Sequence, residues 1–237
     1  NRDTILNLKL NLISGYKSPI LKKPSYAWEF RNSTGSDTVY DMVNGIEATP
    51  VNGATSTSEG MVFDGVDDYV ELVPWEFGET FSIETYIDTS SMNGNDYIIN
   101  FLDEAYRNAL VLLRHNNTIG VGYLGGNNTY THIQRSVSTY TYTGWIHIVA
   151  VIQKNSDETS TLYYYVNNDL VTATLSVVAV RKTRAVHILG SRCDPTQSPA
   201  NFWQFYRGTM AYFRMWDGRA LSGSEVGVLY NKRNVVN

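Results

Sequence analysis

Two carboxylates on one predicted strand, Glu84 and Asp88, come nearest to the arrangement that acid–base chemistry requires. Apolar and polar residues alternate over residues 81–88, so Glu84 and Asp88 share one face of the strand. A retaining glycosidase needs its acid and its nucleophile about 5–5.5 Å apart. Here the two carboxylates are separated along the strand by Tyr86. We therefore expect Glu84 to be an ordinary cross-strand partner and the chain not to be an enzyme.

The residues that most often act as nucleophiles or transition-metal ligands are sparse. The chain has four histidines and one cysteine, and no histidine stands in a His-X-His or Glu-X-X-His spacing. Cys193 lies in a predicted loop without a neighbouring base, and a lone cysteine excludes an intrachain disulfide. We expect His147 to be structural and Cys193 to be inert.

Calcium is the cofactor that the acidic loops favour. Hard cations bind clustered oxygen atoms, which Asp and Asn side chains supply in turns. The candidate ligands are Asp41 and Asn44 in one loop, and Asp64 and Asp67, followed by Asp68, in another. The same residues are also good turn formers, so both roles stay open.

A sugar site needs an aromatic ring for the C–H face of the sugar and planar polar groups for its hydroxyls. Four loop regions have this composition: residues 93–97, 115–117, 125–130 and 192–203. The candidate ligand-binding residues from them are Tyr97, His115, Asn116, Asn127, Asn128, Tyr130, Arg192 and Trp203.

The elements that must position these residues are strands. Alternation with a period of two, bounded by Gly, Asp and Pro, recurs over residues 60–72, 81–88, 97–102, 109–114, 119–124 and 145–153. Ser222, with Glu225 three residues later, is a capping box that predicts one short helical turn. The pattern predicts an all-β fold of antiparallel strands.

Three segments carry a resemblance to a known family. FDGVDDYVEL at residues 63–72, GWIHIVAVIQ at residues 144–153 and GTMAYFRMWDGRALSGSEVGVLY at residues 208–230 resemble the laminin-G-like, concanavalin A-like jelly-roll domains of lectins and glucanases. The resemblance spans residues 26–230. Together with the alternating strands, it implies an all-β, two-sheet antiparallel jelly-roll sandwich. The resemblance also implies a module that binds sugars, often with a structural calcium. The closing Ile-Asp-Glu of the family reads Met210, Ala211 and Tyr212 here, so the usual late carboxylate is missing.

The N-terminal segment differs from the rest of the chain. Residues 4–13 alternate, with Leu6, Leu8, Leu10 and Leu12 on one face, and residues 16–24 read as an extended connector. We place an N-terminal strand and connector at residues 1–24 and the sandwich at residues 25–237. The leucines must pack either on their own sandwich, which we favour, or on another subunit.

Composition narrows the class of partner. The 237 residues carry a net charge of −4 and contain 17 tyrosines, and no basic cluster long enough to follow a phosphate backbone is present. We expect no nucleic-acid partner and no membrane insertion. The sequence predicts a non-catalytic, lectin-like module that binds a glycan or polysaccharide in an extracellular setting, on a cell surface or on a virion surface. The alternatives are a structural or adhesive domain that binds other copies or neighbouring proteins and, less favoured, a polysaccharide hydrolase or lyase.

Overall fold

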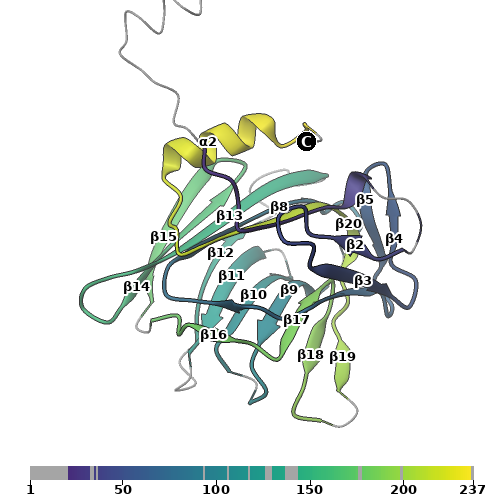
Figure 1. Ribbon diagram of the computed structural model, residues 1–237, viewed down its shortest axis with the longest axis horizontal. Coiled ribbons are helices and arrows are strands. Elements are labelled where there is room, and N and C mark those ends of the chain that lie inside the picture. Colours follow the sequence, from purple (N-terminus) through teal and green to yellow (C-terminus); the bar gives the residue numbers. More distant parts are fainter. Residues whose placement is uncertain are drawn as a thin grey trace, which may run out of the picture.

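The computed structural model describes residues 21–32, 35, 37–92, 94–105, 107–116, 118–125, 130–136, 144–175, 178–197 and 200–235. The predicted N-terminal strand, residues 4–13, lies outside these ranges. No helix within them is long and apolar enough to cross a bilayer. The described chain forms two large antiparallel sheets that face each other (Figure 1), which confirms the predicted sandwich.

The first sheet follows the order β15-β14-β13-β8-β20-β5-β4, and β1 also pairs with β20. Its strands are β1 (Tyr26–Glu29), β4 (Thr55–Thr57), β5 (Gly60–Asp64), β8 (Phe81–Asp88), β13 (Trp145–Lys154), β14 (Ser160–Val166), β15 (Asp169–Leu175) and β20 (Arg207–Asp217). The central strands are buried on both faces, as the two apolar faces of residues 145–153 indicate.

The second sheet follows the order β12-β11-β10-β9-β17-β6-β3-β2. Its strands are β2 (Val39–Tyr40), β3 (Glu47–Val51), β6 (Tyr69–Leu72), β9 (Asp96–Leu102), β10 (Ala109–His115), β11 (Thr118–Leu124), β12 (Tyr130–Ser136) and β17 (Val186–Leu189). Smaller elements complete the described fold: η1 (Phe30–Asn32) and the pairs β7 (Glu76–Phe77) with β16 (Lys182–Thr183) and β18 (Arg192–Asp194) with β19 (Asn201–Trp203).

The core between the sheets is rich in aromatic side chains. Trp28 and Phe213 face each other at a centroid distance of 5.9 Å, and Trp75 packs on Trp28 at 5.3 Å. His187 lies inside this cluster, 4.2 Å from Trp75, and burial lowers the pKa of its imidazole well below the usual value. The core histidine is therefore neutral at physiological pH.

Helix α2 (Gly223–Lys232) covers part of the outer face of the first sheet (Figure 1). Val226 and Leu229 pack on Val149, Val151 and Trp216 of that face. The predicted capping box is present, because Ser222 accepts from the Glu225 N–H and Glu225 accepts from the Ser222 N–H. The helix has 10 residues rather than the single turn that we predicted, since these apolar contacts stabilise it beyond its cap.

A cavity of about 340 Å³ lies beside α2, between β1, β20 and residues 21–24. Its wall is largely apolar and includes Leu21, Met42 and Leu229, with Glu29 and Arg214 among its polar residues. The Trp216 Nε1–H donates to the carbonyl of Lys22 at 2.9 Å and holds the described end of the connector against the sandwich.

Candidate functional site

Three of the predicted ligand-binding residues meet at one place on the second sheet. The Arg192 guanidinium lies 4.8 Å from the centre of the Trp203 ring and 5.3 Å from the centre of the Tyr97 ring. All three side chains are partly exposed. We call this group the Arg192 cluster. It combines two aromatic rings with a planar donor group.

The β18–β19 hairpin positions the Arg192 cluster, and it projects from the side of the molecule opposite α2 (Figure 1). Arg192 is the direct cross-strand partner of Trp203. Gln204 adopts a left-handed backbone conformation, so its carbonyl accepts from the Tyr97 N–H at 3.0 Å. Its side-chain oxygen accepts from Arg192 at 3.0 Å. Gln204 thereby links the hairpin to β9.

A stacked pair anchors the base of the hairpin. The rings of Tyr69 and Phe202 lie 4.5 Å apart with an interplanar angle of 14°. Cys193 pairs with Phe202 across the hairpin and is buried. Our prediction of a loop at Cys193 is wrong because the pairing of β18 with β19 makes it part of a strand. Burial, followed by the charges of Asp194 and Glu71, raises the pKa of the Cys193 thiol to about 11, which makes it a poor nucleophile.

The turn at His115 and Asn116 lies at the same end of the second sheet. Leu113 is the partner of Tyr97, and His115 is two residues further along β10, so His115 shares the face of Tyr97. The N–H of Asn116 donates to the Asn95 side chain at 3.4 Å. Both turn residues are exposed beside the Arg192 cluster.

The remaining sugar candidates do not join this group. Asn127 and Asn128 lie outside the described residues. Tyr130 begins β12 and pairs with Leu124, at the end of β11 opposite to the His115 turn. Its side chain lies outside the described part of the chain.

Asp41 and Asn44, two predicted calcium ligands, are engaged in the structure of their own loop. One Asp41 oxygen accepts from the Ala27 N–H at 2.5 Å, and the other accepts from the backbone and side-chain N–H groups of Asn44 at 2.5 and 3.0 Å. The Asn44 amide also donates to the Ser25 carbonyl at 2.7 Å. Asp41 is buried. These contacts give the pair a turn-forming role.

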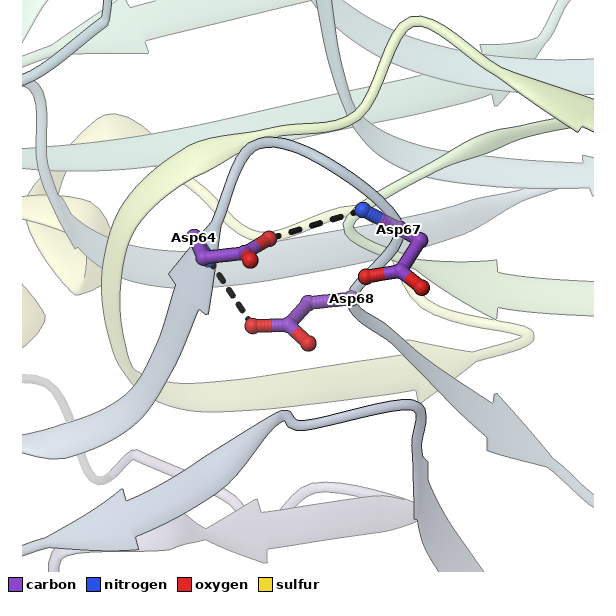
Figure 2. A group of neighbouring side chains, drawn as sticks. All are labelled: Asp64, Asp67 and Asp68. Carbon is purple, nitrogen blue, oxygen red and sulfur yellow. Dashed lines mark hydrogen bonds between the residues drawn. The ribbon is translucent and has the colours of Figure 1, made fainter.

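Asp64 and Asp67, the other predicted ligands, lie with Asp68 in the turn between β5 and β6 (Figure 2). One carboxylate oxygen from each lies within 4.8 Å of the others. Asp68 accepts from the Asp64 N–H at 2.8 Å, and Asp64 accepts from the Val66 N–H at 2.8 Å. We call this group the Asp64 turn.

The surroundings of Asp68 in the Asp64 turn shift its pKa upward. Burial raises the pKa of Asp68, the hydrogen bond from Asp64 lowers it, and the charges of Asp64 and Asp67 raise it again, so that the net shift is upward. Closely spaced carboxylates with a raised pKa are a suitable donor set for a hard cation such as Ca²⁺.

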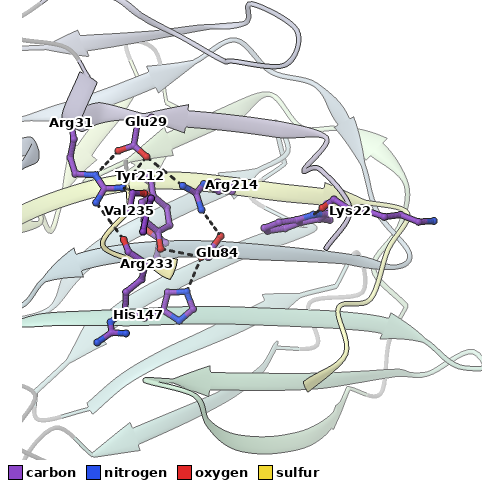
Figure 3. Close-up of polar contacts among 11 residues, drawn as sticks. Lys22, Glu29, Arg31, Glu84, His147, Tyr212, Arg214, Arg233 and Val235 are labelled. Carbon is purple, nitrogen blue, oxygen red and sulfur yellow. Dashed lines mark hydrogen bonds and ion pairs between the residues drawn. The ribbon is translucent and has the colours of Figure 1, made fainter. Parts of the chain in front are cut away.

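Sequence reasoning missed a buried polar network on the outer face of the first sheet (Figure 3). The fully buried Glu84 carboxylate lies 2.8 Å from His147 Nε2 and accepts from the Tyr212 hydroxyl at 3.0 Å and from Arg214 at 3.3 Å. Glu29 pairs with Arg31 at 2.6 Å and with Arg214 at 3.4 Å. Two carboxylates and two guanidinium groups thus form the Glu84 network.

Glu84 is the direct cross-strand partner of Arg214, as predicted, and its carboxylate also belongs to the larger buried network. Burial alone raises the pKa of Glu84, but the hydrogen bond from His147 and the charge of Arg214 outweigh it, so the pKa lies below its usual range. The clue in the sequence was polar residues on strands buried on both faces, where unpaired charges are rare. Because the Glu84 side chain is buried, a polysaccharide cannot reach it in this structure.

Asp88, the candidate acid–base partner of Glu84, forms hydrogen bonds within its own turn. Asp88 accepts from the backbone and the hydroxyl of Ser90 at 3.1 and 2.6 Å. This carboxylate therefore caps the turn after β8. Since Glu84 is buried, the two residues do not present the pair of open carboxylates that a glycosidase needs.

Comparisons with known proteins agree with the sandwich. A model of the concanavalin A-like lectin/glucanases superfamily (Laminin_G_3) matches residues 64–227. No curated protein matches the chain. Similar solved structures include the botulinum neurotoxin serotype D binding domain, at 12% identity and a TM-score of 0.66, with 91% of this chain and 53% of that chain covered.

Two further similar structures are complexes with a bound ligand. One is the serotype D ligand-binding domain in complex with N-acetylneuraminic acid, at 13% identity, a TM-score of 0.64, and 91% and 52% coverage. The other is the binding domain of botulinum neurotoxin DC in complex with SialylT, at 14% identity, a TM-score of 0.64, and 91% and 52% coverage. The present chain spans about half the length of these proteins, and likeness at this level shows a shared fold.

Proposed function

The chain belongs to the concanavalin A-like lectin/glucanases superfamily, and on that premise we propose that it is a non-catalytic module that binds carbohydrate on an extracellular, cell or virion surface. The observation that carries the proposal is the Arg192 cluster, where a guanidinium lies against the rings of Trp203 and Tyr97. Sugar-binding relatives of the same fold support the ligand class.

The Arg192 cluster has the groups that sugar recognition uses. The Trp203 and Tyr97 rings offer apolar faces for sugar C–H groups. Arg192 and Gln204, joined by a hydrogen bond, offer planar donors and acceptors for hydroxyl or carboxylate oxygens. The exposed turn at His115 and Asn116 extends this surface along the end of β10.

A glycan array, with and without calcium, tests the proposal. Trp203→Ala should weaken binding at least about tenfold, because a partly buried aromatic anchor commonly contributes more than about 1.4 kcal/mol. Tyr40→Ala is the matched control, since Tyr40 is exposed and lies outside the cluster. Equal binding by the Trp203 variant and the native protein, or no binding to any glycan, would overturn the proposal.

A structural or adhesive role is the second candidate. Tyr40, Met42 and Val43 are exposed apolar side chains that follow one another in and after β2. Neighbouring exposed apolar residues are typical of protein–protein contacts. This candidate predicts that Met42→Ser reduces self-association or partner binding, measured by sedimentation, while glycan binding is absent.

We also propose that the Asp64 turn binds one calcium ion. Asp64, Asp67 and Asp68 would supply carboxylate oxygens, and the upward pKa shift of Asp68 supports a gain in stability when a cation neutralises the group. Binding to the folded state alone raises its stability by about 2.7 kcal/mol at a calcium concentration 100 times Kd. The melting temperature should therefore rise with calcium and fall with EDTA.

A variant pair makes the calcium test specific. Asp67→Asn should remove most of the response of the melting temperature to calcium, whereas Asp37→Asn, at an exposed position outside the turn, should retain it. A melting temperature that is the same in EDTA and in calcium would contradict the proposal.

A further inference from the structure

A groove of about 350 Å³ lies on the outer face of the first sheet, next to the start of α2. Its lining includes Gln153, Tyr163 and Tyr165 from the sheet and Ser222 and Gly223 from the start of the helix. Its size is in the range of pockets that hold small ligands. Ser222 was identified from the sequence as a helix cap, and none of the named residues was predicted to bind a ligand.

Strand register places the two tyrosines side by side. In the β13–β14 pair, Tyr165 lies opposite Val149 and Tyr163 lies opposite Val151, so both rings are on the outer face. Residues two apart on a strand are separated by about 6.6 Å. Tyr165 is buried to 6% exposure, and Tyr163 is partly exposed over the same apolar cluster. The sheet therefore fixes the rings in a row.

The polar groups of the groove carry no charge. Gln153 is exposed and offers an amide, and each tyrosine offers a hydroxyl that can donate and accept. Burial, followed by the charge of Tyr163, raises the pKa of Tyr165, so its hydroxyl remains protonated. Among the described residues that line the groove, the only titratable side chains are the two tyrosines, whose hydroxyls are protonated at neutral pH.

Gly223 leaves space at the helix end of the groove. A Cβ atom built on Gly223 would lie 3.4 Å from the Tyr165 hydroxyl oxygen. A longer side chain at this position would therefore enter the space above Tyr165. The residue begins a helix and has no unusual backbone angle, so a side chain can be added without backbone strain.

We propose that this groove is a second carbohydrate site, which takes a neutral sugar. The partly exposed ring of Tyr163 suits the C–H face of a sugar, while the amide of Gln153 and the tyrosine hydroxyls suit sugar hydroxyls. A carboxylated sugar would lose hydration here without a cation to compensate it. The inference shares its ligand class with the proposed function, but it depends on a different site.

Titration calorimetry and tyrosine NMR signals test the groove, with maltotriose, cellotriose and lactose as neutral probes and sialyllactose as the acidic probe. At least one neutral probe should bind, and Gly223→Leu should weaken it at least about tenfold by filling the groove. Gly227→Ala, also at a helical glycine, controls for the change in helix propensity. Tyr163→Phe keeps the ring and should weaken binding less than Gly223→Leu.

The Trp203→Ala and Gly223→Leu variants distinguish the two proposed carbohydrate sites. If Trp203→Ala leaves binding of the neutral probe unchanged while Gly223→Leu abolishes it, the groove is a separate site. If no neutral probe binds, or if Gly223→Leu binds as the native protein does, the groove proposal is overturned. Loss of sialyllactose binding in Trp203→Ala tests the Arg192 cluster independently of that result.

Discussion

The Glu84 network and the Asp64 turn both bring carboxylates close to the protein interior, but their electrostatics are opposite. Glu84 is fully buried between His147, Tyr212 and Arg214, and its pKa is lowered. Asp68 has other carboxylates as its charged neighbours, and its pKa is raised. Burial acts in the same direction on both groups, so the neighbours cause the difference.

This contrast distinguishes a carboxylate that stabilises the fold from one that we propose binds an ion. The chain supplies its own cations to Glu84 and Glu29, so that network needs no external ligand. The charges that act on Asp68 are those of the Asp64 and Asp67 carboxylates, and for this reason we propose that the turn binds an ion. A buried acidic group indicates a site for a cation when the surrounding chain leaves its charge unbalanced.

Removal of the Glu84 carboxylate should have the largest effect on stability. Glu84→Ala leaves Arg214 without one of its two carboxylates and His147 without its partner at Nε2. Loss of one partner in a buried ion pair costs about 3–5 kcal/mol. Urea unfolding measures this change, with Asp37→Asn as an exposed control. A loss below about 1 kcal/mol would mean that the network is not structural.

Deletion of residues 1–14 should have the next largest effect. We keep the prediction that the leucines of residues 4–13 pack on the sandwich, and the cavity that Leu21 lines, beside Glu29 and Arg214, is a suitable surface. Burial of one leucine contributes about 1.5–3 kcal/mol. The deletion should lower the free energy of unfolding without abolishing the fold of residues 26–230.

Sedimentation distinguishes the two places where that segment could pack. A smaller free energy of unfolding with unchanged mass supports packing within the chain. Unchanged stability together with a change from oligomer to monomer would show that the segment is an assembly element.

Acid should affect the two regions in opposite directions. Since the pKa of Glu84 is lowered from 4.5, its contribution is present above about pH 4.5 and is lost as the pH falls through the folded-state value. The pKa of Asp68 is raised from 3.8, so its unfavourable contribution disappears as the pH falls through its folded-state value. Urea unfolding from pH 7 to pH 3 should show a shallower acid loss for Glu84→Gln and a steeper one for Asp68→Asn. Parallel profiles for the two variants would contradict the contrast.

Asp68→Asn at pH 7 in EDTA should have the smallest effect. The amide oxygen can still accept from the Asp64 N–H, while the repulsion among the three carboxylates decreases. We expect a gain of at most about 0.5 kcal/mol in the free energy of unfolding, the usual range for substitutions of this kind. A loss above about 1 kcal/mol would show that the Asp68 charge itself stabilises the turn.

Local pattern was sufficient to predict strands and the start of the helix, while the two-sheet sandwich also depended on the family resemblance. Alternation along residues 81–88 and 145–153 predicted β8 and β13, and the Ser222 capping box located the start of α2. Each of these signals lies within one segment and depends on the period of the backbone. The length of α2 did not follow from its cap because its later turns depend on contacts with β13 and β20.

Composition identified residues of the candidate site but not their arrangement. Tyr97 and Arg192 meet because Gln204, near neither in sequence, bonds to both. Likewise Glu84, His147 and Arg214 come from three strands, and Asp41 accepts from Ala27 of another element. Contacts between distant segments depend on which strands become neighbours, and the pattern within one segment does not specify that.

The buried thiol of Cys193 can be used to measure how often the β18–β19 hairpin opens. Cys193 is 1% exposed, so a thiol reagent can reach it when the hairpin opens locally. With opening in rapid equilibrium, the labelling rate measures the fraction of open molecules. A sugar bound to Trp203 across the hairpin would reduce that fraction, so the rate of one chemical modification would record the occupancy of the neighbouring site.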